Sequence, residues 1–216
     1  MGFSEELERL LPEELPNRGR LVEIAARHLD LIVEANQVLN LTRIVGEREA
    51  AIKHVLDSVL PWRLFAGARV VVDAGTGAGL PGIPLAVVFP ETQFVLLESV
   101  QKKTRFVEGA IAALGLKNVL ALPLRAEDWL KANQASVITA RAVAPLERAI
   151  PLFAQGLREG ARALLYKGPD VAREIEAAGL EIRKRRVVVR EVLRYELPDD
   201  SGTRTIVEVV QREENA

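Results

Sequence analysis

The sequence predicts an α/β protein whose mostly parallel β-sheet carries helices on both faces, with an N-terminal helical cap and an antiparallel hairpin at one edge. Three observations predict this fold. Short β-branched segments alternate with helical segments through the middle of the 216-residue chain, which is typical of a parallel sheet. The first sixty-odd residues show helical periodicity. Two long β-rich segments joined by a turn close the chain, as in a hairpin.

The N-terminal segment is predicted to be helical. Ser4 is expected to cap a short helix, and apolar residues over 21–38 recur at the three-and-four spacing of a long helix. A further helix is expected over about 47–60. We therefore assign residues 1–66 to a helical cap and residues 67–216 to one α/β domain.

The domain is predicted to begin with five short, buried, parallel strands. They are expected at residues 68–72, 94–97, 118–122, 137–139 and 161–166. A helix is expected after the first strand, ending at residue 89. Two more are expected over 102–114, after the second strand, and over 146–157, after the fourth. The closing hairpin is expected to pair residues 183–193 with 204–210 across a turn at 198–202.

The composition restricts the classes of function. Basic and acidic residues number 29 and 30, so the formal net charge is −1, and nucleic-acid binding would need a local basic patch. The absence of cysteine excludes a disulfide scaffold and a cysteine nucleophile, and two histidines argue against a histidine metal cluster. We therefore expect no metal. We also expect no membrane span, because no apolar run approaches about 20 residues. The acidic start is unlike a signal peptide, so a cytoplasmic location is expected.

The strongest local signal is a glycine-rich turn after the first strand, with the sequence VVVDAGTGAGLPG over residues 70–82. Glycines let the backbone turn sharply and let a ligand lie against the main chain. Gly77, Gly79 and Gly82 match the spacing of a dinucleotide-binding motif, but the first lies four residues beyond Asp73, which is late for that motif. An acid at the strand tip would also repel a pyrophosphate, whereas it suits the sulfonium and ammonium groups of S-adenosylmethionine (AdoMet). An NAD-dependent oxidoreductase using these three glycines and a non-catalytic nucleotide-binding module remain alternatives.

Residues at the ends of the next strands complete a candidate cofactor site. Glu98 follows the second strand, where an acid accepts hydrogen bonds from the ribose hydroxyls of an adenosine cofactor. Beyond the third strand, Ala126 is expected to pack on the adenine and Glu127 to lie near its exocyclic amine. Arg141 ends the fourth strand, at the sheet edge where ligands of parallel sheets bind.

Six motifs between about residues 31 and 168 together resemble a known family. They are Asn36-x3-Asn40-Leu-Thr, His54-x2-Asp57-Ser58, the run from Asp73 through Gly-Leu-Pro-Gly-Ile-Pro, Glu98-Ser-x3-Lys-Lys103, Arg125-x-Glu127 and Thr139-Ala-Arg141-Ala. These motifs resemble RsmG, also called glucose-inhibited division protein B, the bacterial small-subunit ribosomal RNA guanine-N7 methyltransferase family.

The resemblance implies a class I AdoMet-dependent methyltransferase fold, with S-adenosyl-L-methionine as cofactor. It also implies methyl transfer to N7 of one guanine in 16S ribosomal RNA. The partner would be that RNA, the 30S subunit or an assembly intermediate. The cofactor-binding residues are then expected to be Gly75, Gly77, Leu80, Glu98, Ser99, Ala126, Glu127 and Arg141.

The chemistry of guanine N7 simplifies the expected site. N7 carries an available lone pair, so its attack on a methyl group needs no general base, and catalysis would depend on positioning. Arg141 is our candidate for holding both the methionine end of the cofactor and the target base, for instance by donating to guanine O6. The base must be unstacked to be reached.

Basic residues near this edge are candidates for contact with the substrate. Lys102, Lys103 and Lys167 are the expected substrate residues. The densest basic patch, residues 183–186 with Arg190 and Arg194, serves either as an RNA surface or as protection of an edge strand against aggregation. His54 and Asp57 are expected to form a hydrogen-bonded pair that fixes the cap on the domain.

Overall fold

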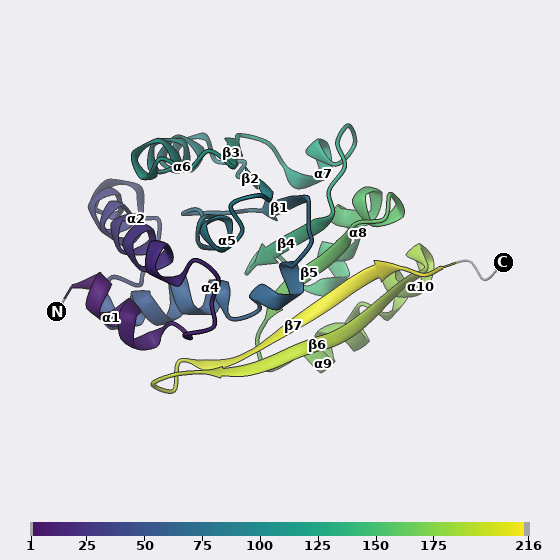
Figure 1. The fold of residues 1–216 in the computed structure, drawn as a ribbon. Helices are drawn as coiled ribbons and strands as arrows, with labels where there is room; N and C mark the ends of the chain where they lie inside the picture. The colour runs from purple at the N-terminus through teal and green to yellow at the C-terminus, as the bar shows by residue number, and fades with distance from the viewer. Residues whose placement is uncertain (1, 214–216) are drawn as a thin grey trace.

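A computed structural model describes residues 2–213, and in them one seven-stranded sheet carries helices on both faces (Figure 1). The strand order is β3-β2-β1-β4-β5-β7-β6. The first five strands are parallel, and β7 runs antiparallel to both β5 and β6. The strands are β1 (Val70–Ala74), β2 (Gln93–Leu97), β3 (Val119–Leu122), β4 (Val137–Arg141), β5 (Arg162–Lys167), β6 (Val187–Leu197) and β7 (Gly202–Gln211). The predicted α/β fold with an antiparallel edge hairpin is confirmed.

The order of the parallel strands determines where a ligand can bind. The chain passes from β1 to β2 on one side and later returns to place β4 on the other side of β1. Loops leaving the carboxyl ends of β1 and β4 therefore diverge, which opens a crevice at that edge of the sheet. The glycine turn follows β1 and Arg141 ends β4, so both belong to this crevice.

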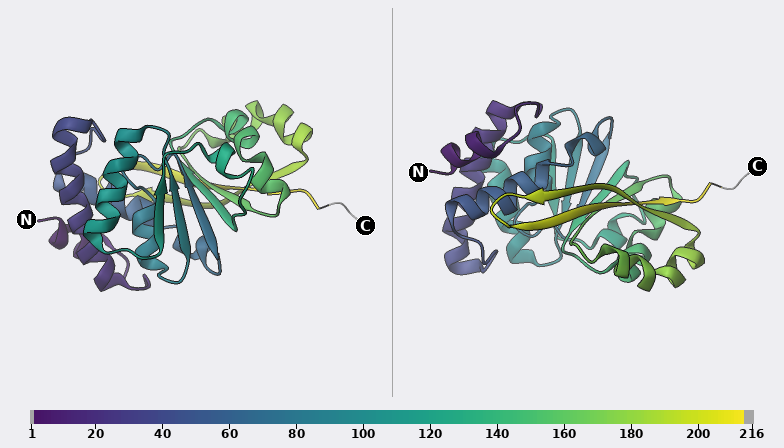
Figure 2. Two further views of the ribbon diagram at one scale, coloured as in Figure 1. Left: turned by 90° about the horizontal axis from the view of Figure 1, so that it is seen from above. Right: turned by 90° about the horizontal axis from the view of Figure 1, so that it is seen from below.

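Helices cover both faces of the sheet (Figure 2). One face packs against the cap and two helices of the domain, and the other against the C-terminal helices. The first group comprises α1 (Phe3–Leu10), α2 (Arg18–Leu39), α5 (Gly82–Val88) and α6 (Gln101–Leu114). The second comprises α7 (Ala126–Trp129), α8 (Leu146–Arg158), α9 (Val171–Ala177) and α10 (Gly179–Arg185).

The cap and the domain share one core. Leu29 of α2, Ile83 of α5 and Leu96 of β2 belong to the same buried cluster. The predicted helix over 47–60 is a continuous helical stretch made of α3 (Glu47–Ala50), the π-helix η1 (Ala51–Leu56) and α4 (Asp57–Val59), and the 3-10 helix η2 (Trp62–Phe65) follows it. The division at residue 66 stays a prediction.

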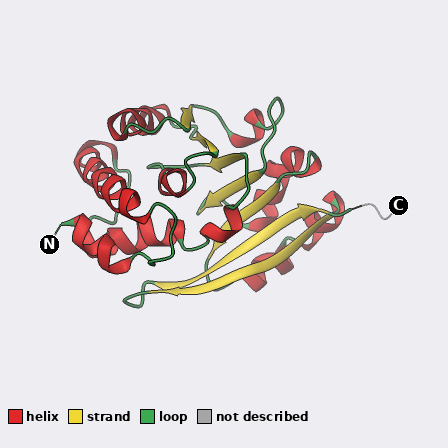
Figure 3. Cartoon of the chain, viewed as in Figure 1, coloured by secondary structure: helices red, strands yellow, loops and turns green. Residues whose placement is uncertain are grey.

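The hairpin reaches from the sheet edge to the cap (Figure 3). Its turn carries Asp199, whose carboxylate accepts hydrogen bonds from Arg48 of α3, with Oδ1 3.0 Å from Nη2. The hairpin therefore lies beside cap helices that are about 150 residues earlier in the chain, and it closes one side of the crevice.

Two local predictions were wrong. Ser4 lies inside α1, whose N-cap is Gly2 without a side-chain hydrogen bond. Residues 183–185 form the last turn of α10 instead of the start of a strand, and β6 begins at Val187. Three basic side chains in a last helical turn are favourable because they face the negative end of the helix dipole. None of the described helices combines the length and apolar character needed to cross a lipid bilayer.

Candidate functional site

The glycine turn is held tightly between β1 and β2. Backbone N–H groups of Gly75 and Thr76 donate to the carbonyl of Leu97, at 2.8 and 3.0 Å. A β-carbon at position 75 would lie 2.8 Å from Cγ2 of Val143. Three glycines adopt the left-handed backbone that glycine tolerates at no steric cost: Gly75, Gly77 and Gly79. A β-carbon at position 79 would lie 2.6 Å from Cδ1 of Ile83. The turn therefore requires glycine for its backbone, and at positions 75 and 79 for space as well.

Asp73 anchors this turn from below. Its Oδ2 accepts hydrogen bonds from the Thr76 hydroxyl at 2.6 Å and from the Gly82 N–H at 2.9 Å. Its Oδ1 is buried and has no hydrogen-bond partner among the described residues. Burial raises the pKa of Asp73 to about 6, against the opposing effect of the two hydrogen bonds and of Arg141. One buried carboxylate oxygen of Asp73 therefore has no hydrogen-bond donor within the turn.

A smaller pocket of about 120 Å³ opens at the carboxyl ends of the first three strands. Glu98 sits in its wall with little exposure, and its Oε1 accepts a hydrogen bond from the Val100 N–H at 2.9 Å. Five of the predicted cofactor residues line this pocket: Gly75, Glu98, Ser99, Ala126 and Glu127. Residues from three separate loops therefore come together as expected.

The other three predicted cofactor residues lie elsewhere. Leu80 is buried in the cluster shared by the cap and the domain, and Gly77 is not in the lining of the smaller pocket. Arg141 lines a larger neighbouring pocket. Val143 lines both pockets and forms their common wall.

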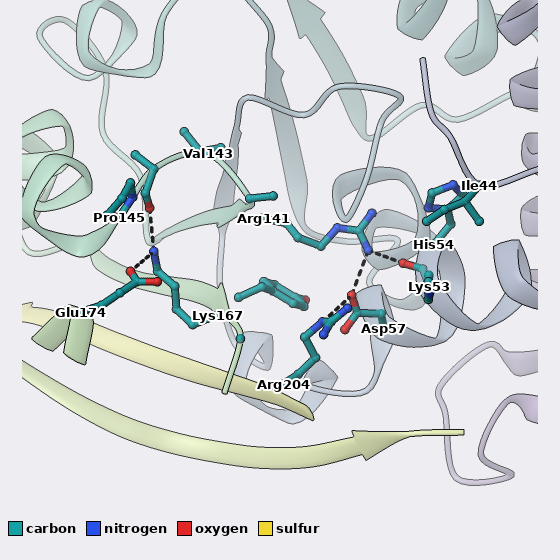
Figure 4. A pocket seen from close by; sticks show the side chains of 14 residues that line it. Ile44, Lys53, His54, Asp57, Arg141, Val143, Pro145, Lys167, Glu174 and Arg204 are labelled. Carbon is teal, nitrogen blue, oxygen red and sulfur yellow. Dashed lines mark hydrogen bonds and ion pairs between the residues drawn. The ribbon is translucent and has the colours of Figure 1, made fainter. Parts of the chain in front are cut away.

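The larger pocket, of about 580 Å³, lies between the cap, the end of β4 and the hairpin (Figure 4). Arg141 projects from β4, and its Nη1 donates to the carbonyl of Lys53 at 2.8 Å. On the opposite wall, Nζ of Lys167 donates to the Ala144 carbonyl at 2.6 Å and pairs with Glu174 at 2.8 Å. Four cations and two carboxylates line the pocket, which leaves it net positive.

The other predicted substrate residues stand apart from this pocket. Lys102 and Lys103 lie in the first turn of α6, just after Glu98 and Ser99, and line neither pocket. Lys167 is the predicted substrate residue that the fold brings to the larger pocket.

The expected hydrogen bond between His54 and Asp57 is absent. Nε2 of His54 lies 3.1 Å from the Thr42 hydroxyl, while Asp57 binds Tyr195 and two arginines. The π-helical turn explains the difference. Its backbone hydrogen bonds join residues five apart, so side chains three apart no longer lie on the same face as they would in an α-helix. Burial, together with the charge of Arg141, lowers the pKa of His54 to about 4, so its ring is neutral near pH 7.

His28 of the cap supports the glycine turn, a contact that no pattern in the sequence predicts. Its ring is fully buried, and Nε2 lies 2.9 Å from the Ala78 carbonyl. Since a carbonyl only accepts, Nε2 carries the proton and donates. Burial lowers the pKa of His28 to about 4. Its position on an apolar helix face gave no signal of this contact.

The family model GidB, described as rRNA small subunit methyltransferase G, matches residues 22–201. The chain belongs to this family. Among the described residues, no group of three His, Cys, Asp or Glu side chains is placed to hold a metal ion.

Curated relatives agree with the family. The chain is 66% identical over 209 residues to "Ribosomal RNA small subunit methyltransferase G" of Solibacter usitatus, a match that covers 97% of this chain and all of the relative. It is 34% identical over 192 residues to the protein of the same name from Carboxydothermus hydrogenoformans, covering 86% and 81% of the two chains.

Solved structures agree with the fold. The O-methyltransferase TomG from Streptomyces achromogenes, solved in complex with SAM, matches with a TM-score of 0.58 at 16% identity, over 86% of this chain and 90% of that one. Cofactor-bound Rv0187 from MTB matches with a TM-score of 0.60 at 17% identity, over 87% and 91%. The fold is that of class I AdoMet-dependent methyltransferases.

Proposed function

We propose that the protein transfers a methyl group from S-adenosyl-L-methionine to N7 of a guanine in small-subunit ribosomal RNA. The observation that carries this proposal is the pair of pockets at one edge of the sheet, separated by Val143. One pocket presents the acid and the glycine turn that suit an adenosine cofactor. The other presents an arginine in a net-positive wall, which suits a nucleotide of RNA.

The residues that line the smaller pocket support an adenosine cofactor there. Glu98 lies where it can accept hydrogen bonds from the ribose hydroxyls, and Ala126 and Glu127 lie where adenine and its amine would sit. The unpartnered Oδ1 of Asp73, beneath the glycine turn, offers a negative charge to a cationic group. When bound, AdoMet supplies an electrophilic methyl group on its sulfonium. The NAD-dependent alternative is dropped, because the family to which the chain belongs consists of methyltransferases.

The residues of the larger pocket would bind and orient the base. Arg141 holds guanidinium N–H groups at the end of β4, from which they can donate to guanine O6 and leave N7 free. No side chain needs to remove a proton, because N7 of neutral guanine carries a lone pair. Orientation of the two reactants can supply about 7–11 kcal/mol of the required barrier reduction.

The proposed partner is ribosomal RNA, as free 16S RNA, as a 30S subunit or as an assembly intermediate. Lys167 would contact it from the wall of the larger pocket, and Lys102 and Lys103 would contact it beside the smaller one. With a ribosomal acceptor, the proposed location of the protein is the cytoplasm.

The test is a transfer assay with methyl-labelled AdoMet. The acceptors are 16S ribosomal RNA and intact 30S subunits from cells that lack the modification. We expect label in at least one acceptor and none in 23S ribosomal RNA. No transfer to either acceptor, with AdoMet still bound, would favour a non-catalytic nucleotide-binding module.

A further inference from the structure

Asp57 lies where four elements of the fold meet. It begins α4 of the cap, and its side chain is only 2% exposed. Oδ1 accepts a hydrogen bond from the Tyr195 hydroxyl of β6 at 3.0 Å. Oδ2 lies 3.3 Å from Nη1 of Arg141 on β4 and 3.4 Å from Nε of Arg204 on β7. One buried carboxylate therefore connects the cap, the central strand and the hairpin (Figure 4).

The contacts of Arg141 are confined to one end of its guanidinium. Nη1 donates to the Lys53 carbonyl at 2.8 Å and also contacts Asp57 and the Ser58 hydroxyl, at 3.3 and 3.4 Å. Within residues 2–213, Nε and Nη2 make no hydrogen bond. A planar guanidinium has donors in a rigid fork, so fixing Nη1 also fixes the direction of the remaining N–H groups at the larger pocket.

Asp57 supplies the only carboxylate, among the described residues, that pairs with Arg141. Lys53 pairs with Glu49 and Lys167 with Glu174, whereas Arg141 and Arg204 share the single carboxylate of Asp57. Removing one partner of a buried ion pair leaves an uncompensated charge, which is strongly unfavourable unless the side chain moves. Without Asp57, both arginines would lose the carboxylate that they share, and Nη1 of Arg141 would keep only the Lys53 carbonyl and the Ser58 hydroxyl as partners.

We infer that Asp57 is a positioning residue for methyl transfer: it holds Arg141 by Nη1 so that Nε and Nη2 face the acceptor base. The inference rests on the proposed function. Tyr195 and Arg204 hold the carboxylate itself, which makes the hairpin part of the active site. Displacement of a reacting group by about 1 Å can cost on the order of a hundredfold in rate, so the effect should be large in catalysis and small in cofactor binding.

The test is a double-mutant cycle with Asp57→Asn, which keeps the side-chain volume, and Arg141→Ala. Single-turnover methyl transfer to the RNA is measured with excess enzyme, beside AdoMet affinity by calorimetry and the melting temperature. We expect Asp57→Asn to slow transfer at least tenfold while AdoMet affinity stays within twofold. In the Arg141→Ala background, Asp57→Asn should cause less than a twofold further loss, because residues that act through one another are non-additive.

The matched control is Glu208→Gln, which removes an ion pair with Arg162 at 3.2 Å farther along the same strand β7. We expect its transfer rate to stay within twofold of wild type. If Asp57→Asn does not fold, Tyr195→Phe removes the hydroxyl that donates to Oδ1 at 3.0 Å and also lies 3.2 Å from the Asp57 carbonyl. This variant should slow transfer at least threefold.

Three results would overturn the inference. The first is a wild-type transfer rate in Asp57→Asn, or in Tyr195→Phe if that variant replaces it. The second is a parallel fall in transfer rate, AdoMet affinity and melting temperature. The third is a double mutant in which the rate losses of Asp57→Asn and Arg141→Ala multiply. If the wild-type protein transfers no methyl group, the proposed function fails and the inference fails with it. An active wild type with an equally active Asp57→Asn contradicts the inference alone.

Discussion

At Gly75, two physical requirements coincide, as they also do at Gly79, where φ is +91° and a β-carbon would lie 2.6 Å from Cδ1 of Ile83. The φ of Gly75 is +69°, and a β-carbon there would lie 2.8 Å from Cγ2 of Val143. Gly77 has a similar φ of +61° but open space around it. Positions 75 and 77 therefore separate backbone strain from loss of space.

We expect Gly75→Ala to reduce AdoMet affinity at least tenfold, because the methyl group strains the backbone and pushes Val143 into the space between the pockets. Gly77→Ala should cost only the left-handed backbone penalty of about 1–2 kcal/mol in the free energy of unfolding. Calorimetric titration with AdoMet and urea unfolding of both variants check this. Equal losses of affinity in the two variants would show that space at position 75 is irrelevant.

The raised pKa of Asp73 predicts that cofactor binding depends on pH. Burial raises its pKa to about 6, with Glu98 adding to the rise and Arg141 opposing it. A cation binds the ionised form, so AdoMet affinity should fall about tenfold from pH 7.5 to pH 5 as Asp73 takes up a proton. Titrations at both pH values test this. Asp73→Asn should bind weakly and equally at both, and a pH-independent wild type would contradict the assignment.

Individual residues could be predicted from the sequence where the backbone alone determines their place. Gly75, Glu98 and Ala126 follow directly after strands or begin helices, so a prediction of the strands already brings them together. The partners of Asp57 are side chains from β4, β6 and β7. No spacing in the sequence encodes such contacts, and the expected pair with His54 was accordingly wrong.

At the scale of elements, α2 of the cap supports the glycine turn through His28. The Nε2–H group donates to the Ala78 carbonyl at 2.9 Å. An unsatisfied buried carbonyl costs about 1–3 kcal/mol. We expect His28→Leu to destabilise the fold by about that amount and to lower AdoMet affinity severalfold, because the turn loosens.

The matched variant is His28→Gln, whose amide N–H can reach the same carbonyl. Its AdoMet affinity should lie closer to wild type than that of His28→Leu, as measured by calorimetry beside urea unfolding. If His28→Leu binds AdoMet as tightly as wild type, the cap helix does not support the turn.

Elements were predictable wherever one periodicity dominated. The buried strands and the long helices α2 and α6 were found within a few residues. The exception was the region before β6, where basic and β-branched residues follow one another. There, packing of α10 against α8 and the helix dipole decide in favour of a helical turn up to Arg185.

At the scale of the whole molecule, three buried groups with shifted pKa values are expected to contribute to the response to acid. His28 and His54 have pKa values lowered from 6.5 to about 4, so the unfolded chain binds more protons than the folded one in this range. Their stabilising contribution is complete above about pH 6.5 and is lost as the pH falls toward 4. Asp73, with its pKa raised from 3.8 to about 6, acts in the opposite direction over about pH 4–6.

Between pH 7 and pH 5, each histidine should lower the free energy of unfolding by about 2 kcal/mol, and Asp73 should raise it by about 1 kcal/mol. We therefore expect a net loss of about 2–3 kcal/mol, measured by urea unfolding at the two pH values. Asp73→Asn should show a larger loss than wild type. Greater stability at pH 5 than at pH 7 would contradict the burial of neutral histidines.

The shape of the whole molecule was predictable because the alternation of strands and helices leaves few topologies. The closure of the crevice was not, since it depends on the hairpin lying against a cap that is distant in sequence. Arg48 and Asp199 show this contact, which is between two exposed side chains on loops and helix ends.

The position of the transferred methyl group tests the central claim most directly. Unmodified 16S ribosomal RNA is incubated with the protein and AdoMet, and the product is treated with borohydride and aniline, which cleave RNA at N7-methylguanosine, before primer extension. We predict one new stop, at a single guanine, that is absent without AdoMet. Methyl label in RNA that shows no such cleavage, or that maps to another base, would contradict transfer to guanine N7.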